Sequence, residues 1–260
     1  MRPTALAALC LAAAVGLTAC GTTKKDSDSG KSSGSASQKE NKEQKKEPFA
    51  DLSGPQIVEQ AVEATRTATS LRLKGDTVDK DGRMVLDMAL NTKDECAGSM
   101  SMDQEGSLNL IKTGETVYIK FDEKFLRSQS EGEPKEETDA AVAMLANRWM
   151  QTKTSEPDAK EFTGVCDLNE VLKEFEDVNS VARKGAVTTV DGQEAITLTE
   201  TDGKETHTLY VATQGEPYLL KVVSQGGDEP GAMSFTDYNK PVPAEAPADK
   251  DVVDLAELAG

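Results

Sequence analysis

The sequence predicts an α+β fold, with one large, curved antiparallel sheet and helices covering its concave face. Alternating apolar and polar residues, the pattern of strands that bury one face, recur from about residue 71 to 121 and again from 182 to 238. Turn pairs such as Asp191-Gly192 separate neighbouring runs and favour hairpins. A sheet this wide curls, so helices on its inner side would leave a groove.

The first predicted helix begins at a capping box. Ser53 can cap the helix, Pro55 suits its first turn and Gln56 completes the box, and apolar residues then recur at helical spacing to about residue 69. A meander of five strands follows. The apolar residues expected on one side of these strands are Leu71 and Leu73; Met84, Leu86, Met88 and Leu90; Met100 and Met102; Leu108 and Leu110; and Val117, Ile119 and Phe121.

The middle of the chain separates the two groups of strands. Residues 122–134 are polar and predict a loop, whereas 138–148 predict a helix. A second polar loop is expected before Cys166, and 167–175 predict another amphipathic helix. An extended, proline-rich tail should pack along a sheet edge after the last strand. The later strands are expected at 182–190, 194–201, 205–213, 217–225 and 232–238.

The N-terminus predicts a lipid-anchored chain. An uncharged, apolar stretch follows Arg2; it is shorter than the roughly 20 residues of a membrane span and is typical of a signal peptide. It ends in Leu-Thr-Ala-Cys at 17–20, which resembles the lipobox of bacterial lipoproteins. The resemblance implies that residues 1–19 are removed and that Cys20 is acylated, which places the protein on the extracytoplasmic face of the cell membrane. A secreted protein with a cysteine at its cleavage site is the alternative.

Residues 20–48 are the predicted tether and 49–260 the folded domain. From 21 to 48 the chain has seven lysines, five acidic residues and a single alanine, so it cannot bury a core and should be disordered. From residue 49 onward, 21 basic and 41 acidic residues give a net charge of −20. Such a domain is repelled by nucleic acid, so we exclude nucleic-acid binding. We expect a monomer that the lipid anchor holds at the membrane.

Two cysteines, Cys96 and Cys166, remain in the domain. Outside the cytoplasm such a pair usually oxidises, so we expect a disulfide between them. The alternative, a metal site, lacks ligands, because the chain contains one histidine, His207, and no second cysteine pair. We therefore expect no metal and no cofactor.

The patterns of known catalytic sites are missing. The sequence has no Gly-x-Ser-x-Gly, no phosphate-binding loop and no dinucleotide-binding glycine pattern. His207 alternates with Leu209 and Val211, so we expect it to face the same side of the strand as they do. We expect its role to be structural. Residues 76–82 faintly resemble a calcium loop, but Met88 stands where the closing glutamate should be, so a hairpin is expected. We therefore expect a protein without enzymatic activity.

Methionine recurs on the predicted strands, at positions that normally favour valine, isoleucine or tyrosine. Its flexible, polarisable side chain suits surfaces that accept varied apolar partners. One hypothesis is that these residues line a cavity for acyl chains; the alternative, which spacing alone favours, is an ordinary core beneath the helices. The candidate ligand-binding residues are Met84, Leu86, Met88, Leu90, Met100, Met102, Leu108, Leu110, Ile119 and Phe121.

Three stretches carry a resemblance to a known family: IVEQAVEATRTATSLRLKGD at 57–76, THTLYVATQGEPYLLKVV at 206–223 and MSFTDYNKPVPAEAPADKDVVDL at 233–255. With the lipobox and tether they are distributed over most of the chain, from residue 17 to residue 255. The chain resembles the actinobacterial LppX/LprG-type lipoproteins, which are related in fold to the LolA and LolB carriers. The resemblance implies a half-barrel whose apolar cavity binds lipids and carries them through the envelope. The cysteine pair and the acidic segment at 122–137 depart from the family pattern.

These observations together favour a membrane-anchored, non-enzymatic protein that binds or carries a hydrophobic ligand, a lipid in the first place. The alternative is an envelope scaffold or sensor with a filled core that acts through contacts with another protein. The sequence specifies neither the ligand nor a protein partner.

Overall fold

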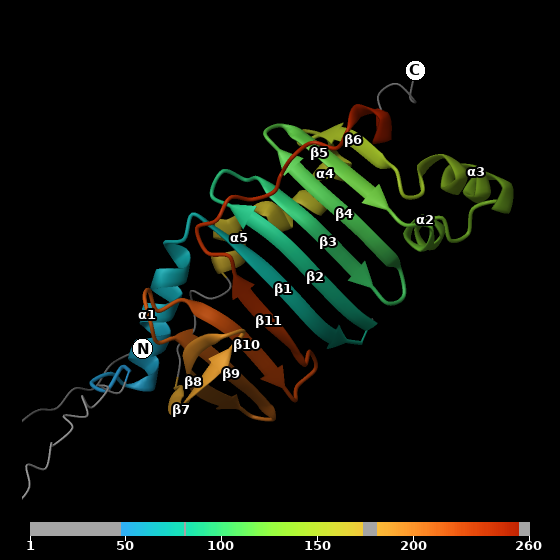
Figure 1. The fold of residues 1–260 in the computed structure, drawn as a ribbon. Coiled ribbons are helices and arrows are strands. Elements are labelled where there is room, and N and C mark those ends of the chain that lie inside the picture. Colours follow the sequence, from blue (N-terminus) through green and yellow to red (C-terminus); the bar gives the residue numbers. More distant parts are fainter. Residues whose placement is uncertain (1–47, 81, 174–180, 255–260) are drawn as a thin grey trace, which may run out of the picture. The chain divides into compact units, whose positions relative to one another are not determined.

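Twelve strands of the described residues form one open sheet (Figure 1). Its strand order is β12-β6-β5-β4-β3-β2-β1-β11-β10-β9-β8-β7. Neighbouring strands are antiparallel except β12 and β6, which are parallel. The two groups of strands meet in the middle, where β1 pairs with β11. The strands are β1 Ser70–Asp79, β2 Gly82–Asn91, β3 Cys96–Met102, β4 Gly106–Thr113, β5 Thr116–Phe121, β6 Trp149–Lys153, β7 Arg183–Val190, β8 Gln193–Asp202, β9 Glu205–Ala212, β10 Leu219–Gln225, β11 Gly231–Thr236 and β12 Val252–Asp254.

The computed structural model describes residues 48–80, 82–173 and 181–254. All of them belong to the unit Lys46–Gly260. The expected signal peptide, Cys20 and the tether up to residue 47 lie outside the described residues and stay predictions.

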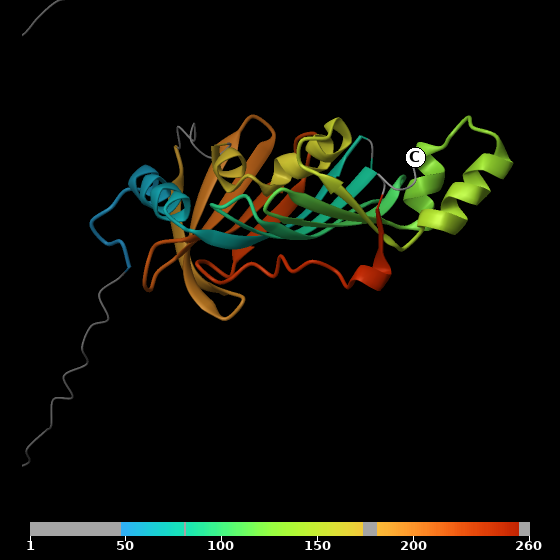
Figure 2. The same ribbon diagram turned by 90° about the horizontal axis from the view of Figure 1, so that it is seen from above.

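The helices cover one face of the sheet and extend from one end of it. Figure 2 shows α1 (blue) and α4 and α5 (yellow) on the same face, and α2 and α3 (yellow-green) beyond the sheet. The fold class predicted from the sequence, α+β with a large, curved, open antiparallel sheet, is confirmed. The helices are α1 Gly54–Arg66, α2 Glu123–Gln129, α3 Lys135–Leu145, α4 Pro157–Thr163 and α5 Leu168–Lys173, with 3₁₀ turns η1 Gly164–Cys166 and η2 Asp249–Asp251.

The core lies between these helices and the inner face of the sheet. Helix α1 begins as predicted, with the Ser53 N–H donating to Gln56 Oε1 at 2.9 Å. Its apolar stripe, Ile57, Val58 and Ala61, is buried and packs against the sheet. Side chains alternate between the two faces of a strand, so every second residue of β1 to β5 joins this core.

The segment between the two groups of strands differs from the prediction. Residues 122–134, expected to be a loop, contain α2, and the expected polar loop before Cys166 contains β6 and α4. In α2 the only large apolar residues are Phe125 and Leu126, which stand among polar and charged residues. One apolar pair does not repeat at helical spacing, so the sequence pattern did not predict a helix. Phe125 is nevertheless buried, so packing against the sheet defines this helix.

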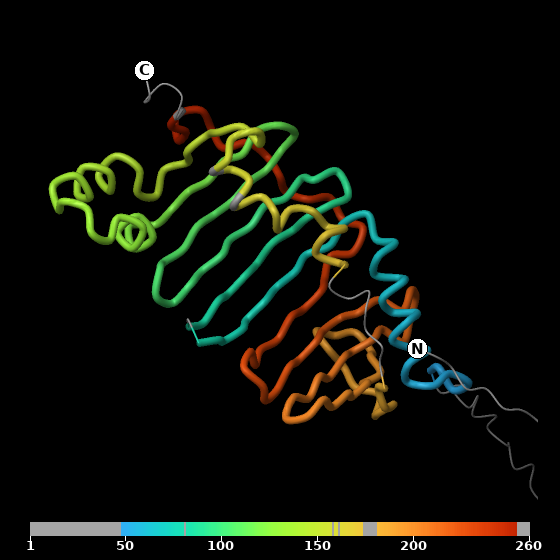
Figure 3. Tube along the Cα trace, turned by 180° about the vertical axis from the view of Figure 1, so that it is seen from behind, coloured from blue at the N-terminus to red at the C-terminus, as the bar shows by residue number. Residues whose placement is uncertain are grey.

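The C-terminal segment crosses the sheet face opposite the helices and ends as β12 on β6 (Figure 3). Asp237 and Asn239 have positive φ values of 52° and 59° and turn the chain after β11. Asn239 Oδ1 accepts a hydrogen bond of 2.8 Å from the N–H of Thr69, which directly precedes β1. Tyr238 stacks on Tyr218 with ring centroids 4.0 Å apart. These contacts fix the start of the segment, whereas the sequence predicted only an extended tail along an edge.

Candidate ligand pocket

A pocket of about 580 Å³ lies on the helix-covered face of the sheet. Its floor consists of inner-face residues of β2 to β6, and its walls come from α2, α4 and η1. The volume falls within the range of roughly 300–1,000 Å³ that is usual for small-molecule sites. The described residues that line it are Met88, Met100, Met102, Glu105, Leu108, Leu110, Ile119, Phe121, Phe125, Leu126, Gln129, Met150, Thr152, Ala159, Phe162 and Val165.

The strand register brings the floor residues together. Met100 pairs with Leu108 across β3 and β4, and Leu108 pairs with Phe121 of β5. Ile119 pairs with Leu110 on one side and with Met150 of β6 on the other. Residues directly opposite each other in an antiparallel pair share a face, so these side chains form one apolar surface.

Seven of the ten candidate ligand-binding residues line this pocket, and three do not. Met84 is 40% exposed near the start of β2, beyond the pocket. Leu86 and Leu90 belong to the core, and Leu90 is fully buried. The seven are Met88, Met100, Met102, Leu108, Leu110, Ile119 and Phe121.

Sequence reasoning missed the residues that close the pocket from above. Phe125 and Leu126 come from α2, Phe162 from α4 and Val165 from η1. Phe121 stacks on Phe125 with centroids 4.5 Å apart and meets Phe162 edge-on at 5.5 Å. Phenylalanines in otherwise polar stretches were the available signal for these walls.

The predicted disulfide between Cys96 and Cys166 is confirmed, and it fastens the roof of the pocket to its floor. Cys96 is the first residue of β3 and Cys166 the last of η1, and both are fully buried. Val165, which lines the pocket, directly precedes Cys166. The bond therefore holds η1 at a fixed place over the sheet.

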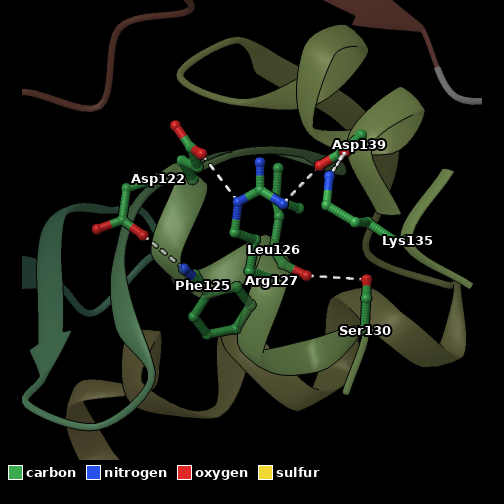
Figure 4. Close-up of polar contacts among 8 residues, drawn as sticks. Asp122, Phe125, Leu126, Arg127, Ser130, Lys135 and Asp139 are labelled. Carbon is green, nitrogen blue, oxygen red and sulfur yellow. Dashed lines mark hydrogen bonds and ion pairs between the residues drawn. The ribbon is translucent and has the colours of Figure 1, made fainter. Parts of the chain in front are cut away.

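Asp122 anchors α2 to the sheet, and Figure 4 shows its bond to Phe125 in the first turn of the helix. Its Oδ1 accepts a hydrogen bond from the Phe125 N–H at 2.7 Å, which caps the helix. Its Oδ2 accepts bonds from the Ser107 N–H at 2.9 Å and the Ser107 hydroxyl at 2.7 Å. Gly106 has a φ of 111°, and a Cβ there would lie 2.4 Å from the Phe125 nitrogen, so α2 depends on glycine at this position.

Ion pairs join α2 to α3. Arg127 bonds to Glu123 and to Asp139, each at 2.8 Å, and Lys135 also pairs with Asp139 (Figure 4). These groups are largely exposed, so each pair contributes little to stability. Helix α3 itself buries mainly Val142.

The environment of Asp122 favours its ionised form. Burial raises the pKa of Asp122, but the hydrogen bonds from Ser107 and from the Phe125 N–H outweigh it, so the pKa lies below the ordinary value of 3.8. A carboxyl whose pKa is lower in the folded state stabilises the fold above its unfolded pKa, near pH 4, and loses this contribution as the pH falls through the folded pKa.

We expect Asp122→Asn to lower the free energy of unfolding by about 1 kcal/mol at neutral pH, because the amide keeps the cap but loses the bonds of the second oxygen. The difference from the wild type should shrink below the folded pKa. Urea unfolding at neutral and acidic pH measures both effects. Asp139→Asn, which alters exposed ion pairs, is the control and should change stability little. The same difference at both pH values would contradict the expected role of the carboxylate.

The part of the chain that the structure describes contains neither a catalytic set around His207 nor a metal-binding cluster. His207 Nδ1 lies 2.9 Å from Ser224 Oγ, and its Nε2 lies 3.7 Å from Glu205. No group of three or more His, Cys, Asp or Glu side chains suited to a metal ion occurs among the described residues. Within the same residues, no helix has the length and apolarity needed to cross a bilayer.

An open antiparallel sheet with an apolar pocket under its helices is the class of structure that these observations define. Comparison with solved structures finds LprF from Mycobacterium bovis, with a TM-score of 0.52 and 11% identity over 75% of this chain and 97% of that one. The Mycobacterium tuberculosis lipoprotein LppX matches with a TM-score of 0.47 and 13% identity, over 74% of this chain and 98% of that one. MucB in the Pseudomonas aeruginosa MucA/MucB complex gives a TM-score of 0.32 and 11% identity, over 76% and 59% of the two chains.

Of these three similarities, the one to LprF has a TM-score above 0.5. Because the sequence identity is 11%, this similarity is evidence for the fold alone. The resemblance predicted from the sequence is thereby confirmed at the level of the fold. No protein-family model matches the sequence, and sequence comparison with curated proteins gives no match either.

Proposed function

We propose that this protein binds a hydrophobic ligand, a lipid, in the pocket between the sheet and helices α2 and α4. The observation that carries the proposal is the pocket itself, about 580 Å³ lined mainly by methionine, leucine and phenylalanine. An ordinary core would fill this space at close packing. Each methylene that moves from water into such a site contributes about 0.8 kcal/mol, which offsets the entropy lost on binding.

The methionines suit a ligand of variable shape. Met88, Met100, Met102 and Met150 line one pocket, and their unbranched side chains adjust to different apolar partners. The lining residues that the structure describes include no nucleophile paired with a base, so the proposed role is binding or transport and not catalysis.

The proposed location is the extracytoplasmic face of the cell membrane, through acyl chains on Cys20. Two or three chains anchor a protein where one chain binds only marginally. A flexible chain of 28 residues, the length of the predicted tether, spans roughly 30 Å, which would let the pocket reach the lipid surface. The net charge of −20 beyond the tether limits adhesion to anionic lipid heads.

Native mass spectrometry of the full-length chain tests the proposal. The protein would be exported with its signal peptide and with Cys20→Ser, so that a lipid mass cannot come from the anchor. We expect the protein to carry a non-covalent adduct in the lipid mass range that dissociates on activation. A protein that emerges empty, and that remains empty after incubation with envelope lipids, would overturn the proposal and favour a scaffold role.

A further inference from the structure

One charged side chain stands at the wall of the pocket. Of the described lining residues, Glu105 alone is charged, and Gln129 and Thr152 are the other polar members. No described residue forms an ion pair with the Glu105 carboxylate, which is exposed to solvent at the turn between β3 and β4. An ionised group at the edge of an apolar pocket acts directly on the polar end of any ligand bound there.

Glu105 and Gln129 lie at the same end of the pocket. The Ser128 hydroxyl donates a hydrogen bond of 2.9 Å to the Glu105 carbonyl, and Gln129 follows Ser128 at the end of α2. The contact brings a carboxylate and an amide together where the β3–β4 turn meets α2. The carboxylate accepts hydrogen bonds, and the amide both donates and accepts them.

The described cations nearest this end of the pocket bond to groups other than the Glu105 carboxylate. Lys124 donates to the carbonyl of Asp103, and Arg127 and Lys135 pair with acidic residues of α2 and α3. Lys112 lies on the same face of the sheet but outside the pocket lining, 4.0 Å from Asp94. The Glu105 carboxylate is therefore not paired with any of these cations, and it is the one charged group in the described lining of the pocket.

We propose that the pocket selects single amphiphiles whose polar end is cationic and donates hydrogen bonds, with Glu105 as the group that recognises the charge. The inference rests on the proposed function, because it assumes that the apolar part of the ligand occupies the pocket. The pocket volume suits one drug-sized molecule. A negatively charged head in the same position would face the carboxylate and bind more weakly.

Competition between matched amphiphiles tests this selectivity. The uncharged fluorophore N-phenyl-1-naphthylamine would report occupancy of the pocket in the full-length chain carrying Cys20→Ser. Monomeric dodecylammonium and dodecanoate would then displace it at neutral pH and low salt. We expect dodecylammonium to bind about tenfold more tightly, a ratio that corresponds to one partly screened charge contact. Added salt should reduce the ratio.

Glu105→Gln should bring the ratio of the two affinities close to one, with each affinity measured against the variant's own affinity for the fluorophore. Glu133→Gln removes the same charge from an exposed residue outside the pocket lining, and it should preserve the ratio. Equal or tighter binding of dodecanoate by the wild type would overturn the proposed selectivity. Loss of the preference in both variants would also overturn it, because the preference would then depend on the overall charge of the protein. Failure of the wild type to bind the uncharged fluorophore would instead overturn the proposed function and the selectivity with it.

Discussion

Replacing Cys96 and Cys166 by alanine together is expected to lower the free energy of unfolding by roughly 4 kcal/mol. The disulfide joins residues 70 positions apart. In the chain-entropy treatment, closing a loop of this length raises the free energy of the unfolded chain by about that amount. Both side chains are fully buried, so alanine adds no hydroxyl to the core, although it leaves a small cavity. Chemical denaturation of the wild type and the double variant measures the difference.

The control for this experiment is the wild type in a reductant. Reduction should lower its unfolding midpoint toward that of the double variant, while the double variant should not respond. Loss of the disulfide, by reduction or by the double substitution, should also weaken fluorophore binding, because η1 and Val165 then lose their fixed position over the pocket. An unchanged midpoint in both comparisons would show that packing alone holds η1 in place.

The sheet could be predicted because its signal is local. Along β2 the residues Met84, Leu86, Met88 and Leu90 occupy alternate positions, and in the structure all four belong to the face that Met100 and Met102 share. A period of two decides the face of each residue before any tertiary contact is known. The turn at Asp191-Gly192 could also be predicted from the sequence, because both residues readily adopt the positive φ that such hairpin turns require and that they have in the structure.

The depth of each residue along its strand could not be predicted from that period. Met84 and Met88 share a face, yet Met84 is 40% exposed and Met88 is 1% exposed. The difference arises from the elements above the sheet, because the pocket walled by α2, α4 and η1 has Met88 in its lining and does not have Met84. Alternation predicts the face that is covered, whereas the length of the covering segment decides which residues reach a pocket.

The non-local parts of the structure left the weakest signals. Helix α2 depends on the contact between Asp122 and Ser107, which lie 15 positions apart. Strand β12 is short and pairs in parallel with β6, about a hundred residues earlier in the chain. Neither contact follows from local propensity, so a polar loop and an extended tail were the natural predictions from the sequence.

Met100→Trp is expected to weaken binding of the uncharged fluorophore by roughly tenfold to a hundredfold without unfolding the domain. Met100 lies in the pocket floor between Leu86 and Leu108 and is only partly buried, so a larger side chain can extend into the open volume. Forcing a ligand into the reduced space then costs about 1–3 kcal/mol, as overpacking does in cores. Fluorophore titration measures the affinity, and thermal unfolding measures the stability.

Met144→Trp is the matched control, because Met144 is 46% exposed on α3 and lies outside the pocket lining. The control should bind the fluorophore like the wild type. A Met100→Trp protein that unfolds at much lower temperature would mean that the space cannot accept a larger side chain, as in a filled core. Normal stability with unchanged binding would place the fluorophore elsewhere. The proposed function requires the remaining combination, in which the domain is stable and the ligand is excluded, since an open pocket can be filled without strain.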